Sequence, residues 1–131
     1  MALKLTLKPG EKVIINGAVL ANAGSKTTLS IENSAVILRE KDILTERNAN
    51  SPAKRIYYCL QLAYLDDEHE REYLEKANLL VREFIEAVPT AEVKEILGSV
   101  GTEVSDRNYF KAMKQMKKLI AFEEKRLNYG G

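Results

Sequence analysis

The chain has 131 residues, a length that fits one compact domain or two small lobes. Its composition, 45% hydrophobic and 30% charged, is typical of a soluble protein, and no apolar run approaches the roughly 20 residues that a membrane span needs. The net charge of +1 excludes a polycation that binds nucleic acid through bulk charge, so any such binding needs a local patch.

The first third of the chain is expected to form five short antiparallel strands. Leu3, Leu5 and Leu7 alternate with polar residues, the period of a half-buried strand. Pro9-Gly10 ends that strand, and Asn16-Gly17 predicts a hairpin with a type I′ turn. The other strands are predicted at 12–15, 18–22, 26–32 and 35–39. Together they predict a β-meander subdomain over residues 1–45, which needs a helix layer or another copy to cover it.

Residues 46–131 are predicted to form a helical subdomain of three to four helices packed against the meander. The expected fold class is therefore α+β, in one compact unit. Ser51-Pro52 is typical of a helix N-cap followed by proline at the first helical position. Gly98 and Gly101 are expected to close the third helix. The helices are predicted at 53–65, 68–88, 91–97 and 106–127.

Residues suited to catalysis are few. His69 stands among consecutive carboxylates, which could bind a metal ion, but on a helix they should fan out around the axis and form a solvated N-terminus instead. Cys59 lies among apolar residues and is expected to pack in the core. As the single cysteine it also allows no intrachain disulfide, which fits a cytoplasmic location. We expect no enzymatic activity, no cofactor and no metal site.

The last predicted helix carries a row of cations. At about 100° per residue, its five members fall within a sector of roughly 60°, opposite the apolar residues. Such a stripe could contact a phosphate backbone, and the alternative is an ordinary solvated face of an amphipathic helix. Its members are Arg107, Lys111, Lys114, Lys118 and Lys125.

A second basic site is predicted at the start of the first long helix. Lys54 and Arg55 stand next to Tyr57 and Tyr58. Cations beside aromatic rings could hold a single nucleic-acid strand through phosphate contacts and base stacking. The alternative is a helix start with buried tyrosines.

Five fragments of the chain resemble, in the same order, the FlbT family of flagellar-biosynthesis repressors. The similarity extends over about residues 3 to 126. It implies a cytoplasmic post-transcriptional regulator that associates with the 5′ untranslated region of flagellin mRNA and promotes its degradation, and that is not an enzyme. The fragments are KPGE (8–11), ING (15–17), IEN (31–33), LREKDIL (38–44) and SPAKRIYYCLQLAYLD (51–66).

The sheet is also distantly similar to CsrA, a family of small RNA-binding regulators with five strands per chain in an intertwined dimer. The stretches LTLKPGEKVIING and REKDI carry this likeness. It implies RNA contacts from the first and fifth strands, with Arg39 in the fifth-strand role. The first-strand arginine of CsrA falls on Leu7 here, which leaves Lys4, Lys8 and Lys41 as the other cations of this surface.

The first hypothesis is thus an RNA-binding repressor whose partner is the flagellin mRNA leader. The rival hypothesis is a protein-interaction module that binds flagellin or another flagellar regulator, and it fits the near-neutral charge better. Open strand edges further suggest a homodimer, and no membrane contact is expected.

Overall fold

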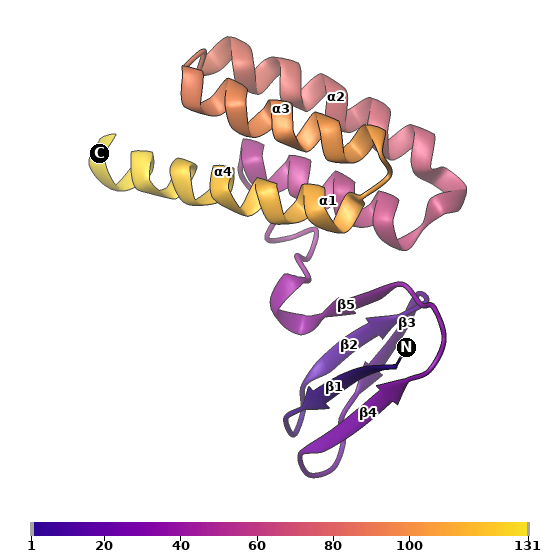
Figure 1. The fold of residues 1–131 in the computed structure, drawn as a ribbon. Coiled ribbons are helices and arrows are strands. Elements are labelled where there is room, and N and C mark those ends of the chain that lie inside the picture. Colours follow the sequence, from indigo (N-terminus) through magenta and orange to yellow (C-terminus); the bar gives the residue numbers. More distant parts are fainter. Residues whose placement is uncertain (1, 131) are drawn as a thin grey trace. The chain divides into compact units, whose positions relative to one another are not determined.

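The computed structural model describes residues 2–130, and for residues 127–130 it describes only the backbone. The chain divides into two compact units, Met1–Ile43 and Leu44–Gly131, which we call the β unit and the helical unit. The first unit contains five strands and the second contains four long helices, which carry their labels in Figure 1. The predicted α+β class is confirmed.

The β unit contains two antiparallel sheets, one of two strands and one of three. β1 pairs with β4, with Leu5 opposite Leu29, and β2 lies between β3 and β5. A 3-10 turn, Glu40–Asp42, follows the last strand. The strands are β1 (Leu3–Leu7), β2 (Lys12–Ile15), β3 (Ala18–Ala21), β4 (Thr27–Ile31) and β5 (Ile37–Arg39).

The pairing order differs from that of a meander, in which each strand pairs with the next. β1 leaves β2 to pair with β4, and β5 returns to pair with β2. The physical reason is burial of apolar side chains. A single open sheet of such short strands would leave its apolar face exposed to solvent, whereas two sheets can bury apolar side chains between them. In two sheets, Leu5 and Leu7 of β1 pack with Val13 of β2, and partly buried aliphatic residues of the other strands surround them.

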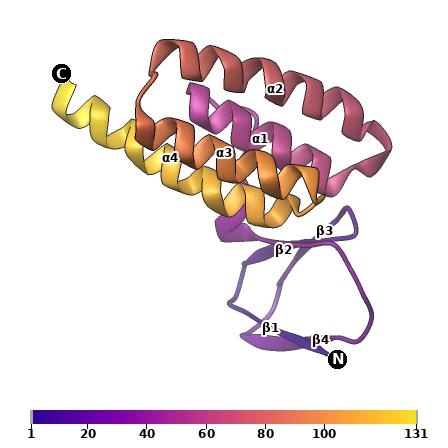
Figure 2. The same ribbon diagram turned by 45° about the horizontal axis from the view of Figure 1, so that its top comes forward.

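The helical unit is a bundle in which α1 and α4 form the centre. α1 packs along α2 and α4, and α3 packs along α4, whereas the packing of α2 on α3 is less close. Figures 1 and 2 show the four helices from two sides. The most deeply buried large side chains are Ile56, Leu60, Val93, Met113, Met116 and Leu119. The helices are α1 (Pro52–Leu65), α2 (Glu70–Ala87), α3 (Ala91–Ser105) and α4 (Tyr109–Gly130).

The expected closure of α3 by glycine is wrong. The helix continues through Gly98 and Gly101 to Ser105, because Leu97 and Val100 are buried on the same helix face as Val93. The left-handed position that follows the helix end is occupied by a non-glycine residue, Arg107, whose φ is 59°. The amide of Arg107 donates to the Val104 carbonyl and that of Asn108 to the Glu103 carbonyl, the two bonds of a Schellman motif.

The predicted cap of α1 is confirmed. Ser51 has extended backbone, its Oγ accepts from the amide of Lys54, and Pro52 occupies the first helical position. The carboxylate of Glu123, from α4, accepts a further hydrogen bond of 3.0 Å from the amide of Ala53. Two side chains from different parts of the unit therefore satisfy the free amides at this helix start. None of the helices described here has the length and hydropathy to cross a bilayer.

Candidate nucleic-acid interface

Two tight turns shape the surface of the β unit. Gly10 has a φ of 79°, and the Glu11 amide donates to the Lys8 carbonyl at 3.0 Å, which is the geometry of a type II turn. Asn16 and Gly17 have φ values of 49° and 84°, so the predicted type I′ corner is confirmed. The side-chain oxygen of Asn16 also accepts from the amide of Val36, which holds the segment before β5 against this corner.

Asn22 fastens the first turn to the loop after β3. Its side-chain amide donates to the carbonyls of Leu7 and Lys8 at 3.1 Å and to that of Ser25 at 2.9 Å. Its own carbonyl accepts from the amide of Gly10 at 2.7 Å. Asn22 was predicted only as the last residue of the third strand, because its hydrogen-bond partners come from two separate segments that no local pattern connects.

Arg39, the residue predicted to contact RNA from the fifth strand, also connects the two sheets. Its Nη2 donates to the Thr6 carbonyl at 2.7 Å and lies 3.2 Å from the Glu11 carboxylate. The pKa of Glu11 is lowered, first by the hydrogen bond from the Lys8 amide and then by Arg39. About a third of the Arg39 side chain stays exposed, so it can serve a ligand while it holds the sheets together.

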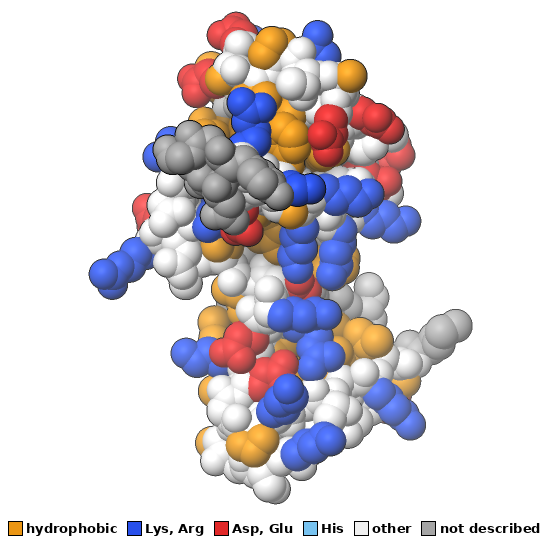
Figure 3. Space-filling model, turned by 90° about the vertical axis from the view of Figure 1, so that its left-hand side faces the viewer, with side chains coloured by type: hydrophobic (Ala, Val, Ile, Leu, Met, Phe, Trp, Pro, Cys, Tyr) orange, Lys and Arg blue, Asp and Glu red, His pale blue; other side chains and the backbone are white. Residues whose placement is uncertain are grey.

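A basic depression surrounds this arginine. It is an open hollow of about 800 Å³ that extends from the Pro9-Gly10 turn to the turn after β5. Lys8, Arg39 and Lys41 were predicted as site residues, and the structure places all three along it, together with Lys26, which the sequence analysis missed. Figure 3 shows the Lys and Arg side chains of this unit gathered beside acidic ones, which in the depression are Glu11 and Glu40. Lys4 is exposed on β1 but does not line the hollow.

At the start of α1, the predicted basic site offers its cations to a nucleic acid but does not offer the predicted stacking surface of Tyr57. Arg55 is exposed and Lys54 is partly exposed, as a contact to phosphate requires. Tyr57, however, is only 3% exposed and presents no ring face for stacking on a base. Tyr58 is half-buried, and burial raises the pKa of its hydroxyl.

The basic row of α4 is shorter than predicted. Arg107 precedes the helix, in the left-handed turn, and its Nε lies 3.8 Å from the Glu70 carboxylate. The predicted alignment of Arg107 with the lysines assumed a helix from Asp106, which the Schellman turn rules out. Lys111, Lys114, Lys118 and Lys125 are all exposed on α4, and we call these four residues the α4 stripe. The ammonium group of Lys114 lies 5.0 Å from the centre of the Phe110 ring.

Charge within the helical unit is strongly segregated. Residues 66–106, which contain α2 and α3, hold twelve Asp/Glu and four Lys/Arg, a formal charge of −8. Residues 107–131, which contain α4, hold seven Lys/Arg and two Asp/Glu, a charge of +5. The near-neutral net charge of the chain is therefore the sum of one acidic and one basic region, and only the basic region can attract a polyanion.

The turn between α1 and α2 differs from the expected helix start. Residues 67–69 form a 3-10 turn, so the ligand atoms of Asp66, Glu68 and His69 converge within 4.8 Å instead of fanning out. His69 Nδ1 lies 2.9 Å from the Asp66 carboxylate, which raises the pKa of the imidazole, while His69 lowers the pKa of Asp66. The His69 side chain is about half exposed and that of Asp66 less so, and the arrangement is accounted for as a polar cap on the turn.

Cys59 packs in the core, as predicted. It is 4% exposed on α1, and burial raises the pKa of its thiol. A buried thiol with a raised pKa carries little thiolate at neutral pH, which makes it a poor nucleophile.

The comparisons with known proteins place the chain in a family. The model of the family described as flagellar protein FlbT matches residues 3–127. The chain belongs to the FlbT family. A probable flagellum biosynthesis repressor protein FlbT from Caulobacter sp. (strain K31) is 41% identical over 98% of both chains. The corresponding protein of Rhodopseudomonas palustris (strain TIE-1) is 38% identical over 98% of this chain and 99% of the relative.

A third relative is named a flagellum biosynthesis repressor protein without the word "probable". The flagellum biosynthesis repressor protein FlbT of Caulobacter vibrioides (strain ATCC 19089 / CIP 103742 / CB 15) is 36% identical over 98% of this chain and 92% of its own length. No solved structure matches the chain. Membership of the FlbT family supports a repressor role in flagellar regulation.

Proposed function

We propose that this protein is a post-transcriptional repressor of flagellin synthesis that binds the 5′ untranslated region of flagellin mRNA and promotes its degradation. It acts in the cytoplasm as a binding protein, without a cofactor. The observation that carries the proposal is the basic depression, where Lys8, Lys26, Arg39 and Lys41 come together from separate segments of the β unit.

Local geometry compensates for the low net charge. Phosphate binding depends on the cations that reach the backbone and release counterions, not on the charge of the whole chain. The depression supplies four such cations, and the exposed lysines of the α4 stripe supply four more on the helical unit. Because the Glu11 carboxylate and the Thr6 carbonyl fix Arg39, its orientation is set before RNA arrives.

A titration of leader RNA against the purified protein at two salt concentrations tests the proposal. The double variant Lys26→Glu with Lys41→Glu should weaken leader binding and lower the salt slope by about one for each phosphate that the protein no longer neutralises. Lys12→Glu with Lys4→Glu is the matched control, because these lysines are exposed on the same unit but do not line the depression. Equal weakening in the two double variants would contradict the assignment of the site.

Arg39 itself needs a gentler substitution. Arg39→Ala would remove the bonds to Thr6 and Glu11 and loosen the sheets along with the surface. Arg39→Lys keeps the charge but removes the planar fork of donors. We expect it to weaken RNA binding by about 1–3 kcal/mol, the value of one specific contact.

The acidic half of the helical unit favours a second candidate function. A charge of −8 over residues 66–106 repels RNA and suits a protein surface, such as that of flagellin or another flagellar regulator. In a pull-down from lysate, reversing acidic residues of α2 should then reduce capture of a flagellar protein while leaving leader binding intact. If leader RNA does not bind at all but such a protein is captured, this second function replaces the first.

We also propose that the protein is a homodimer joined through the β unit. β3 has no second strand partner among residues 2–130, and all four of its residues are exposed, with Val19 at 66%. A unit of about 40 residues with a small core gains stability from pairing such an edge with a second copy. Light scattering at tens of micromolar should show a dimer. A strict monomer would contradict this proposal.

A further inference from the structure

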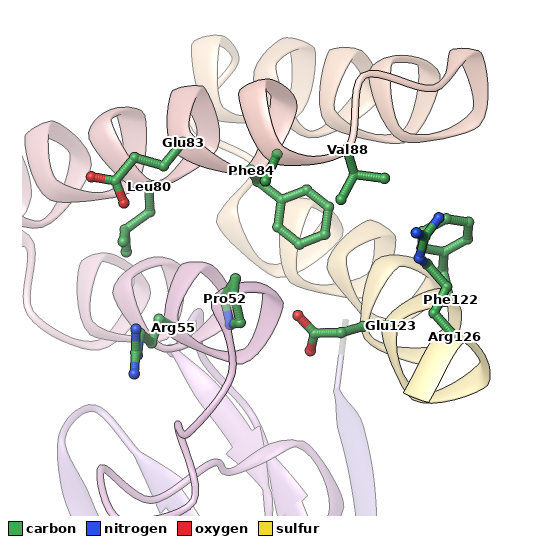
Figure 4. Close-up of a pocket in the computed structure, with 10 residues that line it drawn as sticks. Pro52, Arg55, Leu80, Glu83, Phe84, Val88, Phe122, Glu123 and Arg126 are labelled. Carbon is green, nitrogen blue, oxygen red and sulfur yellow. The ribbon is translucent and has the colours of Figure 1, made fainter. Parts of the chain in front are cut away.

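The helical unit contains a pocket of about 540 Å³ between the start of α1, the second half of α2 and the second half of α4. Its walls are mostly apolar and include Leu80, Phe84 and Val88 from the α2 side and Phe122 from α4 (Figure 4). This volume lies within the usual range for small-molecule sites, and the apolar walls with a few polar groups are typical of them.

A stacked pair stands at the edge of this pocket. The guanidinium carbon of Arg126 lies 5.7 Å from the centre of the Phe122 ring, and Figure 4 shows the two side chains together. Arg55 approaches the same pocket from α1. An aromatic ring with an arginine over it is a surface on which a flat π-system can stack, because both groups interact with ring faces.

The acidic groups of the pocket do not cancel these cations. The carboxylate of Glu123 accepts the hydrogen bond of the Ala53 amide at the positive end of the α1 dipole, which offsets its charge. Glu83 is exposed at the rim, where its oxygens can accept hydrogen bonds from a ligand.

The α4 stripe leads to the pocket. Lys118, Phe122 and Arg126 follow one another at four-residue intervals, so they form one row along α4. The aromatic wall therefore has a cation one helical turn before it and another one turn after it. A base on this wall would bring one neighbouring phosphate near Lys118, while Arg126 stays stacked beside the base and Arg55 of α1 lies at the pocket to meet the other phosphate. Aromatic rings flanked by cations are typical of single-strand binding sites.

We propose that this pocket binds an unpaired nucleobase of single-stranded RNA. The base stacks against Phe122 and Arg126, while Lys118 and Arg55 hold the neighbouring phosphates. This inference rests on the proposed function and adds to it a second contact point, on the helical unit, that selects single strands over duplex.

A single tryptophan tests the stacking directly. The chain has no tryptophan, so Phe122→Trp introduces one fluorophore at the aromatic wall. A short single-stranded RNA of mixed sequence should quench its emission through stacking. The control is an abasic oligonucleotide of the same length, which carries the same phosphates without bases and should leave the emission unchanged. Equal quenching by both oligonucleotides, or quenching by neither, would overturn the proposal.

A pocket-filling variant tests the site without altering its cations. Ala87 is exposed at the end of α2 and lines the pocket, so Ala87→Leu should occupy part of it and lower the affinity for the mixed-sequence RNA at least about fivefold. Ala91→Leu makes the same change at an exposed position on α3 outside the pocket and should leave affinity unchanged. Equal affinities of the two variants would overturn the proposal.

The outcomes separate this inference from the proposed function. Suppose that the wild-type protein binds leader RNA, that this binding requires Lys26 and Lys41, and that the tryptophan emission is not quenched. The pocket proposal is then contradicted, while the proposed function is supported. If the wild-type protein binds no RNA, both the proposed function and the pocket proposal are contradicted. If an apolar peptide or a fatty acid quenches the tryptophan and RNA does not, the pocket belongs to another ligand and the proposal is overturned.

Discussion

The two units of this chain are stabilised in different ways. The helical unit buries long side chains such as Leu60, Met116 and Leu119 between its helices. The β unit buries a small cluster around Leu5, Leu7 and Val13 and adds polar clamps at its turns and between its sheets. A substitution should therefore have a global effect in the helical unit and a local effect in the β unit, even though basic residues lie on both surfaces.

The largest effect is expected from Leu60→Ala. Leu60 is fully buried on α1, so its truncation should lower the free energy of unfolding of the helical unit by about 2–5 kcal/mol. Urea unfolding followed by far-ultraviolet circular dichroism measures this change. Leu79→Ala, at an exposed position of α2, is the control and should change stability by less than about 0.5 kcal/mol. Similar values for the two variants would mean that α1 does not form the centre of the bundle.

A smaller and more local effect is expected from Asn22→Ala. The change removes the side-chain donor to three backbone carbonyls and should lower the free energy of unfolding of the β unit by about 1–3 kcal/mol. Because the clamp holds a turn and a loop of the β unit, amide hydrogen exchange should accelerate in residues 3–39 and stay constant in the helices. Asn33→Ala is the control, at an exposed position between β4 and β5. Faster exchange throughout the chain would show that the units do not respond separately.

Gly17→Ala should lower the free energy of unfolding of the β unit by about 1–2 kcal/mol. Gly17 has a φ of 84°, and residues with a side chain adopt this conformation only at an energetic penalty. Gly24→Ala is the matched control, since Gly24 has no positive φ and lies in the next turn along the chain. The melting of the β unit, followed by residue-specific nuclear magnetic resonance, distinguishes the two. If Gly24→Ala is the more harmful change, the turn at Asn16-Gly17 is not what limits the hairpin.

Features encoded within a few residues could be predicted from the sequence. The Asn16-Gly17 corner and the Ser51 cap depend on the conformations and side chains of adjacent positions, and both are present. The strand pairing could not be predicted in the same way, because alternation shows which face of β1 is buried but not that its partner is β4. For the same reason the place of Arg39 at the end of a predicted strand did not show its bond to the Thr6 carbonyl.

The candidate site was predictable only as far as its members lie close in sequence. Lys26 joins Lys8, Arg39 and Lys41 because the loop before β4 reaches the same depression, which no local pattern indicates. Arg107 was misplaced because a left-handed conformation is uncommon for a residue with a side chain, so a helix was assumed to run through it.

The smallest effect is expected at the polar turn between α1 and α2, the counterpart of the Asn22 clamp in the helical unit. The pKa of His69 is raised, chiefly by its hydrogen bond to Asp66 and then by the charges of Asp66, Glu72 and Glu68. A raised pKa in the folded state means that the contact stabilises the fold fully below the unfolded pKa of about 6.5 and that this contribution disappears as pH rises through the folded value.

Asp66→Asn should therefore lower the measured pKa of His69. His69 is the only histidine of the chain, so a proton resonance titration follows it without ambiguity. Asp67→Asn is the matched control, because Asp67 is the exposed neighbour and does not contribute to the shift. Since both groups are partly exposed to solvent, salt should screen the effect, and the difference between the His69 pKa values of the two variants should narrow at high ionic strength. An equal lowering in both variants would assign the shift to general negative charge and not to the Asp66 contact.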